Sequence, residues 1–408
     1  MPETPLISLE EIEEDTFRCP HCDAEHSSEI DADECCGYAC PRCGDRYSDP
    51  YSADECCPVY HCPNCGSEWD SHEEAEECCR QGGSRSYPAL TELQSVYRLG
   101  VPELPNRPAR LCSIEQEVVD GGAAAAQMLY DFGFAATSDF GSYSSSPRRG
   151  MVGVVADGSL PSEGGEIIYS RFLLSEEADV EVISRAAARM RQLAREANIV
   201  RVGKAAGTHI HISATAEDGT RIGPSQMAAL HEIFSYAEDF LYSIAAAGWD
   251  THRSPVGRNG GYCMPIPKLA DGERRSGFAV HRLMAANRYF GLNFQRLLNA
   301  ASNCSCGAAR FGEWDACECG TFDGATVEWR LFNASTKPET LHAWLILSHA
   351  LTALAMTHPV GTLPTNGYGL TDANSRKAVQ QWIEQNAPLT DDEVQVIRNA
   401  VRRSPRMR

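Results

Sequence analysis

Three pairs of polar residues, each set within an apolar and β-prone stretch, constrain the fold of this chain more than any other feature. The members of each pair are one residue apart: Glu115 and Glu117, His209 and His211, and Glu328 and Arg330. On a β-strand, residues i and i+2 point to the same face of the sheet. Three such strands in one sheet would direct three carboxylates, two imidazoles and one guanidinium at a common surface. Carboxylates bind hard divalent cations and arginine binds phosphate, so we expect a metal and nucleotide site, and hence an enzyme.

Each pair taken alone also has an ordinary structural explanation. A Glu-x-Glu pair is often a solvated strand face, a His-x-His pair can be packed in a sheet, and a Glu-x-Arg pair is commonly a local salt bridge. Here the pairs lie in the apolar segments LCSIEQEVV, GTHIHIS and ATVEWRLF. Because burying charges without partners is costly, the three pairs together favour one shared site.

The acidic charge of the chain is concentrated near its N-terminal end. The net charge is −20 over 408 residues, and residues 1–80 contain 22 acidic and 4 basic side chains. Such a segment would repel a phosphate backbone, so we expect no nucleic-acid partner. The first residues lack a basic start and an apolar run, and the most apolar window, residues 341–356, is interrupted by polar residues. We interpret that window as a buried helix, and we expect no membrane partner and a cytoplasmic location.

Three cysteine-rich repeats follow one another between residues 18 and 80. Each contains an aromatic residue, the motif Cys-Pro-x-Cys, 12 further residues and a Cys-Cys pair, and the repeats restart after 21 and 22 residues. With 18 cysteines and no export signal, we expect metal ligands in place of disulfides. The candidate zinc ligands of the repeats are Cys19, Cys22, Cys35, Cys36, Cys40, Cys43, Cys56, Cys57, Cys62, Cys65, Cys78 and Cys79.

The repeats are too short to bury much apolar surface, so zinc would have to supply their folding energy. We expect a hairpin that carries the Cys-x-x-Cys motif, followed by a short helix that ends in thiolates. Two arrangements stay open, because adjacent cysteines seldom bind one metal. Either one cysteine of each pair is a ligand, or a pair such as Cys35 and Cys36 serves the next motif, at Cys40 and Cys43. Disulfide-linked loops are a less favoured alternative.

The chain is predicted to contain an acidic tail (1–17), three tandem zinc repeats with four cysteines each (18–80), a linker (81–110) and a catalytic domain (111–408). In the catalytic domain, predicted strands and helices alternate and the polar pairs lie on strands, which indicates an α+β fold. One predicted helix covers residues 278–300. An insertion at 301–324 contains four cysteines whose spacing predicts one more structural zinc site: Cys304, Cys306, Cys317 and Cys319.

The order of the motifs from residue 111 to about residue 358 resembles that of the amidoligase family. The matching segments, in chain order, are IEQE, DGSLPSEGGEIIYS, GTHIHIS, RNGGYC, RYFGLN and VEWRLFNAS. Members of this family are carboxylate–amine ligases whose fold is similar to that of glutamine synthetase. The resemblance implies an antiparallel or mixed sheet with flanking helices, and ATP-dependent formation of an amide or peptide bond. The zinc repeats lie outside the resemblance.

The resemblance also implies metal ligands. Glu115, His209 and Glu328 match the family's ligands for one divalent cation, Mg²⁺ or Mn²⁺. Glu117 and Glu166 match ligands of a second cation.

Further positions match residues near the nucleotide and the substrate. Arg330 matches the arginine that stabilises the transferred phosphate, and His211 matches a second histidine near ATP. Arg258 and Arg288 resemble nucleotide or substrate contacts, and Arg288 is also a candidate catalytic residue. Asp157 resembles a substrate-side catalytic residue and, with Glu163, is a candidate base for the amine.

The implied chemistry fits these residue types. A carboxylate is a poor acyl donor at neutral pH, but transfer of the ATP γ-phosphoryl group converts it to an acyl phosphate that an amine can attack. Two cations and an arginine would neutralise and align the phosphoryl group. The alternatives are a metal-dependent hydrolase, which would turn over without ATP, and a catalytically inactive zinc adaptor. The carboxylate and amine substrates stay open, and the repeats are expected either to recruit a peptide or protein substrate or to be purely structural.

Overall fold

The computed structural model describes residues 96–140, 149–195, 197–203, 206–245, 263–267, 289–307, 317–363 and 373–404, a few single positions outside these ranges, and six two-residue strands before residue 70. The chain divides into two compact units, Met1–Tyr87 and Pro88–Arg408.

In the first unit, three short antiparallel hairpins flank the three Cys-Pro-x-Cys motifs in the sequence. Their strands are β1 (Phe17–Arg18) with β2 (Glu25–His26), β3 (Tyr38–Ala39) with β4 (Arg46–Tyr47), and β5 (Tyr60–His61) with β6 (Glu68–Trp69). The twelve cysteines of the repeats lie outside the described residues, so zinc binding by the repeats stays a prediction.

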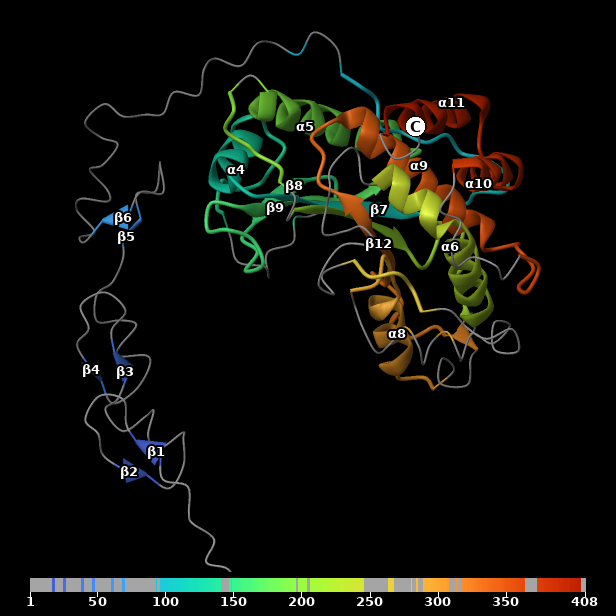
Figure 1. Cartoon of the computed structure of the whole chain (residues 1–408), viewed down its shortest axis with the longest axis horizontal. Helices are drawn as coiled ribbons and strands as arrows, with labels where there is room; N and C mark the ends of the chain where they lie inside the picture. Colours follow the sequence, from blue (N-terminus) through green and yellow to red (C-terminus); the bar gives the residue numbers. More distant parts are fainter. Residues whose placement is uncertain are drawn as a thin grey trace, which may run out of the picture. The chain divides into compact units, whose positions relative to one another are not determined.

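The second unit is built on a six-stranded antiparallel sheet, which confirms the predicted α+β class (Figure 1). Its strands, in spatial order, are β11 (Leu292–Asn293), β12 (Thr326–Asn333), β10 (Gly207–Ser213), β7 (Leu111–Val118), β9 (Gly165–Leu173) and β8 (Val152–Val155). The strands that carry the three polar pairs, β12, β10 and β7, are therefore direct neighbours at the centre of the sheet. The predicted convergence of the pairs on one sheet is confirmed.

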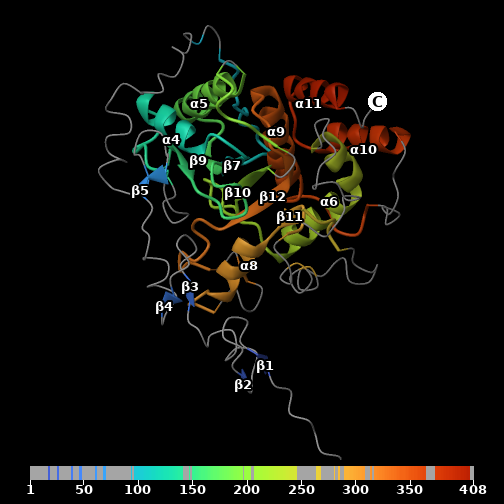
Figure 2. The same cartoon turned by 60° about the vertical axis from the view of Figure 1, so that its left-hand side comes forward.

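Helices cover one face of this sheet. The helices in the described residues are α4 (Gly122–Asp131), α5 (Glu177–Arg195), α6 (Pro224–Ala245), α8 (Gln295–Ser302), α9 (Pro338–Leu354), α10 (Ala373–Asn386) and α11 (Asp391–Arg403). In Figures 1 and 2, α4, α5 and α9 lie along the same side of the sheet. Phe332 of β12 stacks on Trp344 of α9, with ring centroids 4.9 Å apart, and Trp329 packs against Phe234 of α6.

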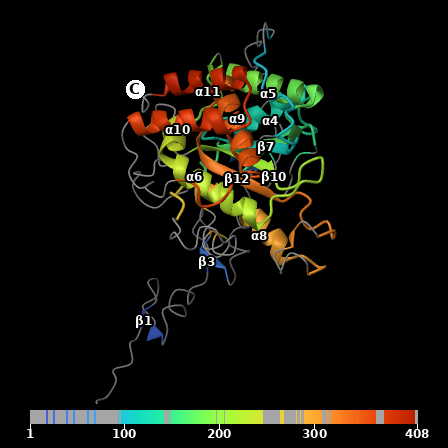
Figure 3. The ribbon, with the colours of Figure 1, turned by 90° about the vertical axis from the view of Figure 1, so that its right-hand side faces the viewer.

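The alternation of the strands leaves the polar pairs on the opposite face. Glu328 and Arg330 flank Trp329, and the pleat directs neighbouring residues to opposite sides. Helix α8 lies on that opposite side, below the sheet in Figure 3. The window predicted as a buried helix is α9, whose side chains are almost all buried. No helix in the described part of the chain is both long and apolar enough to cross a membrane.

The single helix predicted over residues 278–300 is interrupted by a strand. Residues 292 and 293 form the edge strand β11, which pairs with β12, and α8 begins only at Gln295. Gly291 explains the interruption, because a Cβ at this position would lie 2.4 Å from the Tyr242 hydroxyl. The backbone approaches α6 closely here, and this contact positions the short strand.

The segment before β7, predicted as part of a linker, packs into the second unit. Leu99 is fully buried, and the buried Arg107 forms an ion pair with Glu393 of α11, with Nη2 2.9 Å from Oε1. This contact joins the start of the unit to its last helix.

Candidate metal centre

The strand register places the acidic and imidazole side chains side by side. His209 of β10 is paired with Glu115 of β7, His211 of β10 with Glu328 of β12, and Glu117 of β7 with Glu166 of β9. Residues directly opposite each other in an antiparallel pair present their side chains on the same face. Four strands therefore contribute to one patch, and every side chain named here is buried or nearly so.

The two imidazoles lie between the carboxylates. His209 Nδ1 is 3.4 Å from Glu115 Oε2, 3.7 Å from Glu328 Oε1 and 3.9 Å from Glu166 Oε1. On the other side of the ring, His209 Nε2 is 3.5 Å from Glu117 Oε1. The cluster is thus centred on His209.

Ligand atoms from this cluster come together in three groups, in each of which they lie within 4.8 Å of one another. The groups are Glu115, Glu166 and His209; Glu115, His211 and Glu328; and Glu117, Asp157 and Glu166. Carboxylate-rich groups of this size match the ligand sets of Mg²⁺ and Mn²⁺. The site is therefore a possible metal centre that offers positions for two ions.

Neighbouring side chains fix the orientation of the carboxylates. Asn293 Nδ2 donates to Glu328 Oε2 at 2.8 Å, and Arg330 donates to the other oxygen of the same carboxylate. The backbone N–H of Gly207 donates to Glu117. Such outer contacts hold metal ligands in a defined geometry.

The electrostatics of the cluster favour ionised carboxylates. Burial raises the pKa of Glu115, but the charges and hydrogen bonds of His211 and His209 outweigh it and hold the pKa well below its usual value. Burial likewise raises the pKa of Glu328, and the charges of His211, Arg330 and His209 reverse the shift. Burial lowers the pKa of Arg330, which the adjacent Glu328 more than offsets. Ionised carboxylates are the form that binds a cation.

The site residues predicted from the sequence fall into three groups according to where they lie in the structure. Glu115, Glu117, Glu166, His209, His211, Glu328 and Arg330 gather on one sheet face, and Asp157 joins them through Glu117 and Glu166. The structure thus places the Asp157 carboxylate where a cation would be held, whereas the sequence suggested a role toward the substrate. Arg258 and Arg288 lie outside the described residues.

Among the described residues, Glu163, the other candidate base, does not belong to the groups of ligand atoms. It lines a surface groove of about 460 Å³ together with Asp120 and Arg201, whose side chains form an ion pair.

Sequence reasoning missed three polar residues of this face. Asn293 and Arg296 flank the start of α8, and Arg296 Nη2 lies 3.5 Å from Glu115 Oε1. Asn333 is paired with Gly207, and neither polar atom of its buried side-chain amide has a hydrogen-bond partner among the described residues. The short edge strand β11 was the missing information, because it places Asn293 opposite Glu328.

The four cysteines of the insertion form a second possible metal-binding group. Their sulfur atoms lie 3.1–3.7 Å apart in the pairs Cys304–Cys306, Cys304–Cys317, Cys304–Cys319, Cys306–Cys317 and Cys317–Cys319. Four thiolates around one zinc ion at about 2.3 Å each would be spaced by a similar distance. The prediction that these four residues converge is confirmed.

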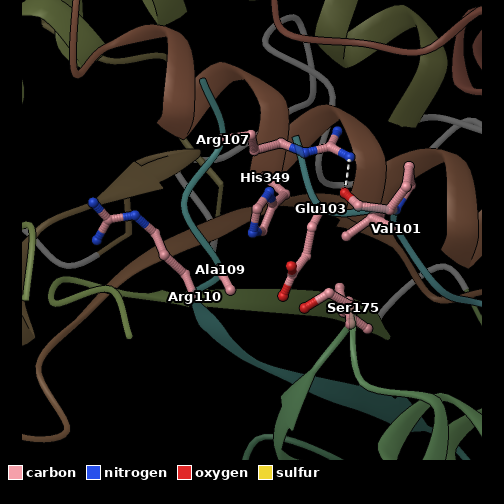
Figure 4. A pocket seen from close by; sticks show the side chains of 9 residues that line it. Val101, Glu103, Arg107, Ala109, Arg110, Ser175 and His349 are labelled. Carbon is pink, nitrogen blue, oxygen red and sulfur yellow. Dashed lines mark hydrogen bonds between the residues drawn. The ribbon is translucent and has the colours of Figure 1, made fainter. Parts of the chain in front are cut away.

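A third polar group lies between the sheet and α9, and it has a structural character. Arg107, Arg110 and His349 line an enclosed pocket of about 10 Å³, enough for one water molecule (Figure 4). Burial and the charges of Arg107 and Arg110 lower the pKa of His349 to about 3, so its imidazole is neutral.

No family model matches this chain, and no curated protein matches it. The fold and the site themselves define the class: an α+β unit whose central antiparallel sheet carries a carboxylate and imidazole cluster suited to divalent cations.

Proposed function

We propose that the protein is an ATP-dependent carboxylate–amine ligase of the amidoligase type, with a fold like that of glutamine synthetase. The observation that carries the proposal is the convergence of the Glu115, Glu117, Glu166 and Glu328 carboxylates around His209 on one sheet face. Arg330 lies beside these carboxylates. Its guanidinium is suited to bind a phosphate group, which favours a metal and nucleotide site over a site that binds metal ions alone. The motif order supports the same function.

In this proposal the cluster holds two divalent cations, Mg²⁺ or Mn²⁺. Glu115, His209 and Glu328 hold one ion, since His209 Nδ1 lies 3.4 Å from Glu115 and 3.7 Å from Glu328. Glu117 and Glu166, now joined by Asp157, hold the other. When bound, the two cations would neutralise the triphosphate and align its terminal phosphorus with the attacking oxygen.

The residues of the chain then have distinct tasks. Arg330 would contact the transferred phosphoryl group, and its ion pair with Glu328 orients it before the substrate arrives. His211, whose Nδ1 lies 3.1 Å from the Thr326 hydroxyl, would lie near the nucleotide. A group that is already oriented loses little free energy on reorganisation during the reaction.

The reaction balances in two steps. A carboxylate oxygen of the first substrate attacks the γ-phosphorus of ATP, which forms an acyl phosphate and releases ADP. The amine of the second substrate attacks the acyl carbon, the C–O bond to phosphate breaks, and the amine proton passes to a base. Glu163 is the candidate for this base, and its side chain lines a surface groove.

The zinc sites belong to the same proposal. We assign zinc to the four cysteines of the insertion, because four thiolates select a tetrahedral soft site. We assign zinc also to the N-terminal repeats, which would recruit a peptide or protein substrate to the ligase.

The test is a screen for ADP release against paired libraries of carboxylates and amines, with products identified by mass. The account predicts Mg²⁺-dependent ADP release that requires both substrates and yields an amide. Bond cleavage by the metal-loaded protein without ATP would show a hydrolase instead.

A further inference from the structure

Helix α8 carries an arginine whose guanidinium lies at the rim of the metal centre. Arg296, in its first turn, has a side chain that is 56 % exposed, yet its Nη2 lies 3.5 Å from Glu115 Oε1. Glu115 lies beside both imidazoles of the metal centre. The Arg296 guanidinium next to Glu115 is therefore close to the place where the phosphates of a nucleotide would contact the bound metal ions. An exposed arginine can turn from the carboxylate to a phosphate oxygen at little cost.

The position of Arg296 depends on how α8 is held. The helix has 8 residues, which is too short to be stable by itself. Leu297 and Leu298 bury one side of it, and its N-terminal end follows the edge strand β11. Its C-terminal end, Ser302, leads within two residues to Cys304.

The four cysteines bring together the two ends of the segment that runs from α8 to β12. Cys304 and Cys306 follow the helix, whereas Cys317 and Cys319 precede the strand that carries Glu328 and Arg330. Buried residues of this segment, among them Trp314 and Phe322, belong to the main apolar core, and their ring centroids lie 5.6 Å apart. A metal ion bound by four thiolates would cross-link the two ends of this segment.

An arginine ties this segment to the loop before α6. Arg221 donates to the backbone carbonyl of Cys317 at 2.9 Å, and its guanidinium lies 4.8 Å from the Phe322 ring centroid. The cysteine group is therefore fixed relative to the sheet, and a metal ion bound by the four cysteines would be fixed as well.

We propose that a metal ion bound by Cys304, Cys306, Cys317 and Cys319 positions α8, so that Arg296 lies at the rim of the metal centre and binds the phosphates of the nucleotide. Arg296 is the binding residue and the cysteine group is the positioning device. The second half of this inference rests on the proposed ligase function, whereas the first half does not.

The first half is tested by hydrogen exchange on the full chain. Cys306→Ser removes an exposed thiol, and Ser305→Ala is the matched control at an exposed neighbour. The expected result is the loss of one zinc equivalent and faster amide exchange, by about tenfold or more, in residues 295–302 of the cysteine variant only. Unchanged exchange in this helix after the zinc loss, or unchanged zinc content, would overturn the positioning role.

The second half is tested by calorimetry with Mg²⁺ and the non-hydrolysable analogue AMP-PNP. Arg296→Gln and Cys306→Ser should each weaken binding by about tenfold, and the double variant should bind like Arg296→Gln alone. Losses that multiply would show that the cysteine group does not act through Arg296. If the unmodified chain does not bind AMP-PNP, the proposed ligase function and the phosphate role of Arg296 both fail, while the exchange experiment still decides the positioning role.

Discussion

Glu115 links the two imidazoles of the metal centre to Arg296 of α8. Its carboxylate lies 3.0 Å from His211 Nε2, 3.4 Å from His209 Nδ1 and 3.5 Å from Arg296 Nη2. The sequence predicted the two histidine contacts, because strand alternation places i and i+2 residues on one face. It did not predict the Arg296 contact, because that contact comes from a helix whose start depends on the unforeseen strand β11.

At the residue scale, Glu328→Gln tests the ligand assignment. The substitution keeps the shape of the side chain but removes the charge that Arg330 and a cation both need. The affinity for AMP-PNP in the presence of Mg²⁺ should fall by about tenfold or more, while the zinc content stays constant.

The matched control for this variant is Glu181→Gln, which neutralises an exposed carboxylate on α5. Calorimetry that finds equal nucleotide affinity in the two variants would refute the assignment of Glu328 as a metal ligand.

At the scale of elements, the strands were more predictable than the segment before α8. The apolar segments that carry the polar pairs located β7, β10 and β12 to within a few residues, because each strand is long and half or fully buried. The two-residue strand β11 has no periodicity of its own, and its existence depends on a tertiary contact between Gly291 and Tyr242. Helical propensity across residues 278–300 therefore gave the wrong assignment there.

Gly291→Ala tests this explanation of the edge strand. The added methyl group would lie 2.4 Å from the Tyr242 hydroxyl and 3.2 Å from the Phe234 ring, both in the buried core. Overpacking of this kind costs about 1–3 kcal/mol. Urea denaturation should show a free energy of unfolding reduced by that amount.

Gly158→Ala is the control for Gly291→Ala, because a Cβ at Gly158 meets open space. Equal stability of the Gly291 variant and the parent chain would contradict the close contact with α6.

At the scale of the whole molecule, the second unit is held together by polar groups that the sequence did not reveal. Arg107 and Arg110 precede β7, and His349 comes from α9 about 240 residues later, yet they line one pocket (Figure 4). Nothing in the spacing of these residues indicated that they would line one pocket, since each looks like an ordinary surface charge or helix residue in the sequence.

The neutral, buried His349 predicts that stability depends on pH. Its folded-state pKa of about 3 is below the ordinary value of 6.5, so the unfolded chain binds more protons between these values. The stabilisation from the neutral His349 is fully present above about pH 6.5. It is lost as the pH falls from about 6.5 to about 3, by up to about 1.4 kcal/mol of unfolding free energy per pH unit.

Urea denaturation between pH 7 and pH 4 should show this loss of unfolding free energy. In the His349→Met variant, the slope of unfolding free energy against pH should be smaller, by an amount that corresponds to about one bound proton. His231, whose pKa burial lowers to about 4, contributes equally to both chains and serves as an internal reference. Parallel pH profiles for the two chains would contradict a buried neutral His349.

The central claim is that the shared sheet face binds two divalent cations and a triphosphate. The most direct measurement is a crystal structure with Mn²⁺ and AMP-PNP, in which anomalous scattering locates the metal. The account predicts one manganese peak bound by Glu115, His209 and Glu328, a second bound by Glu117 and Glu166, and the γ-phosphate beside Arg330. A nucleotide bound elsewhere, or the absence of manganese from this face, would contradict it.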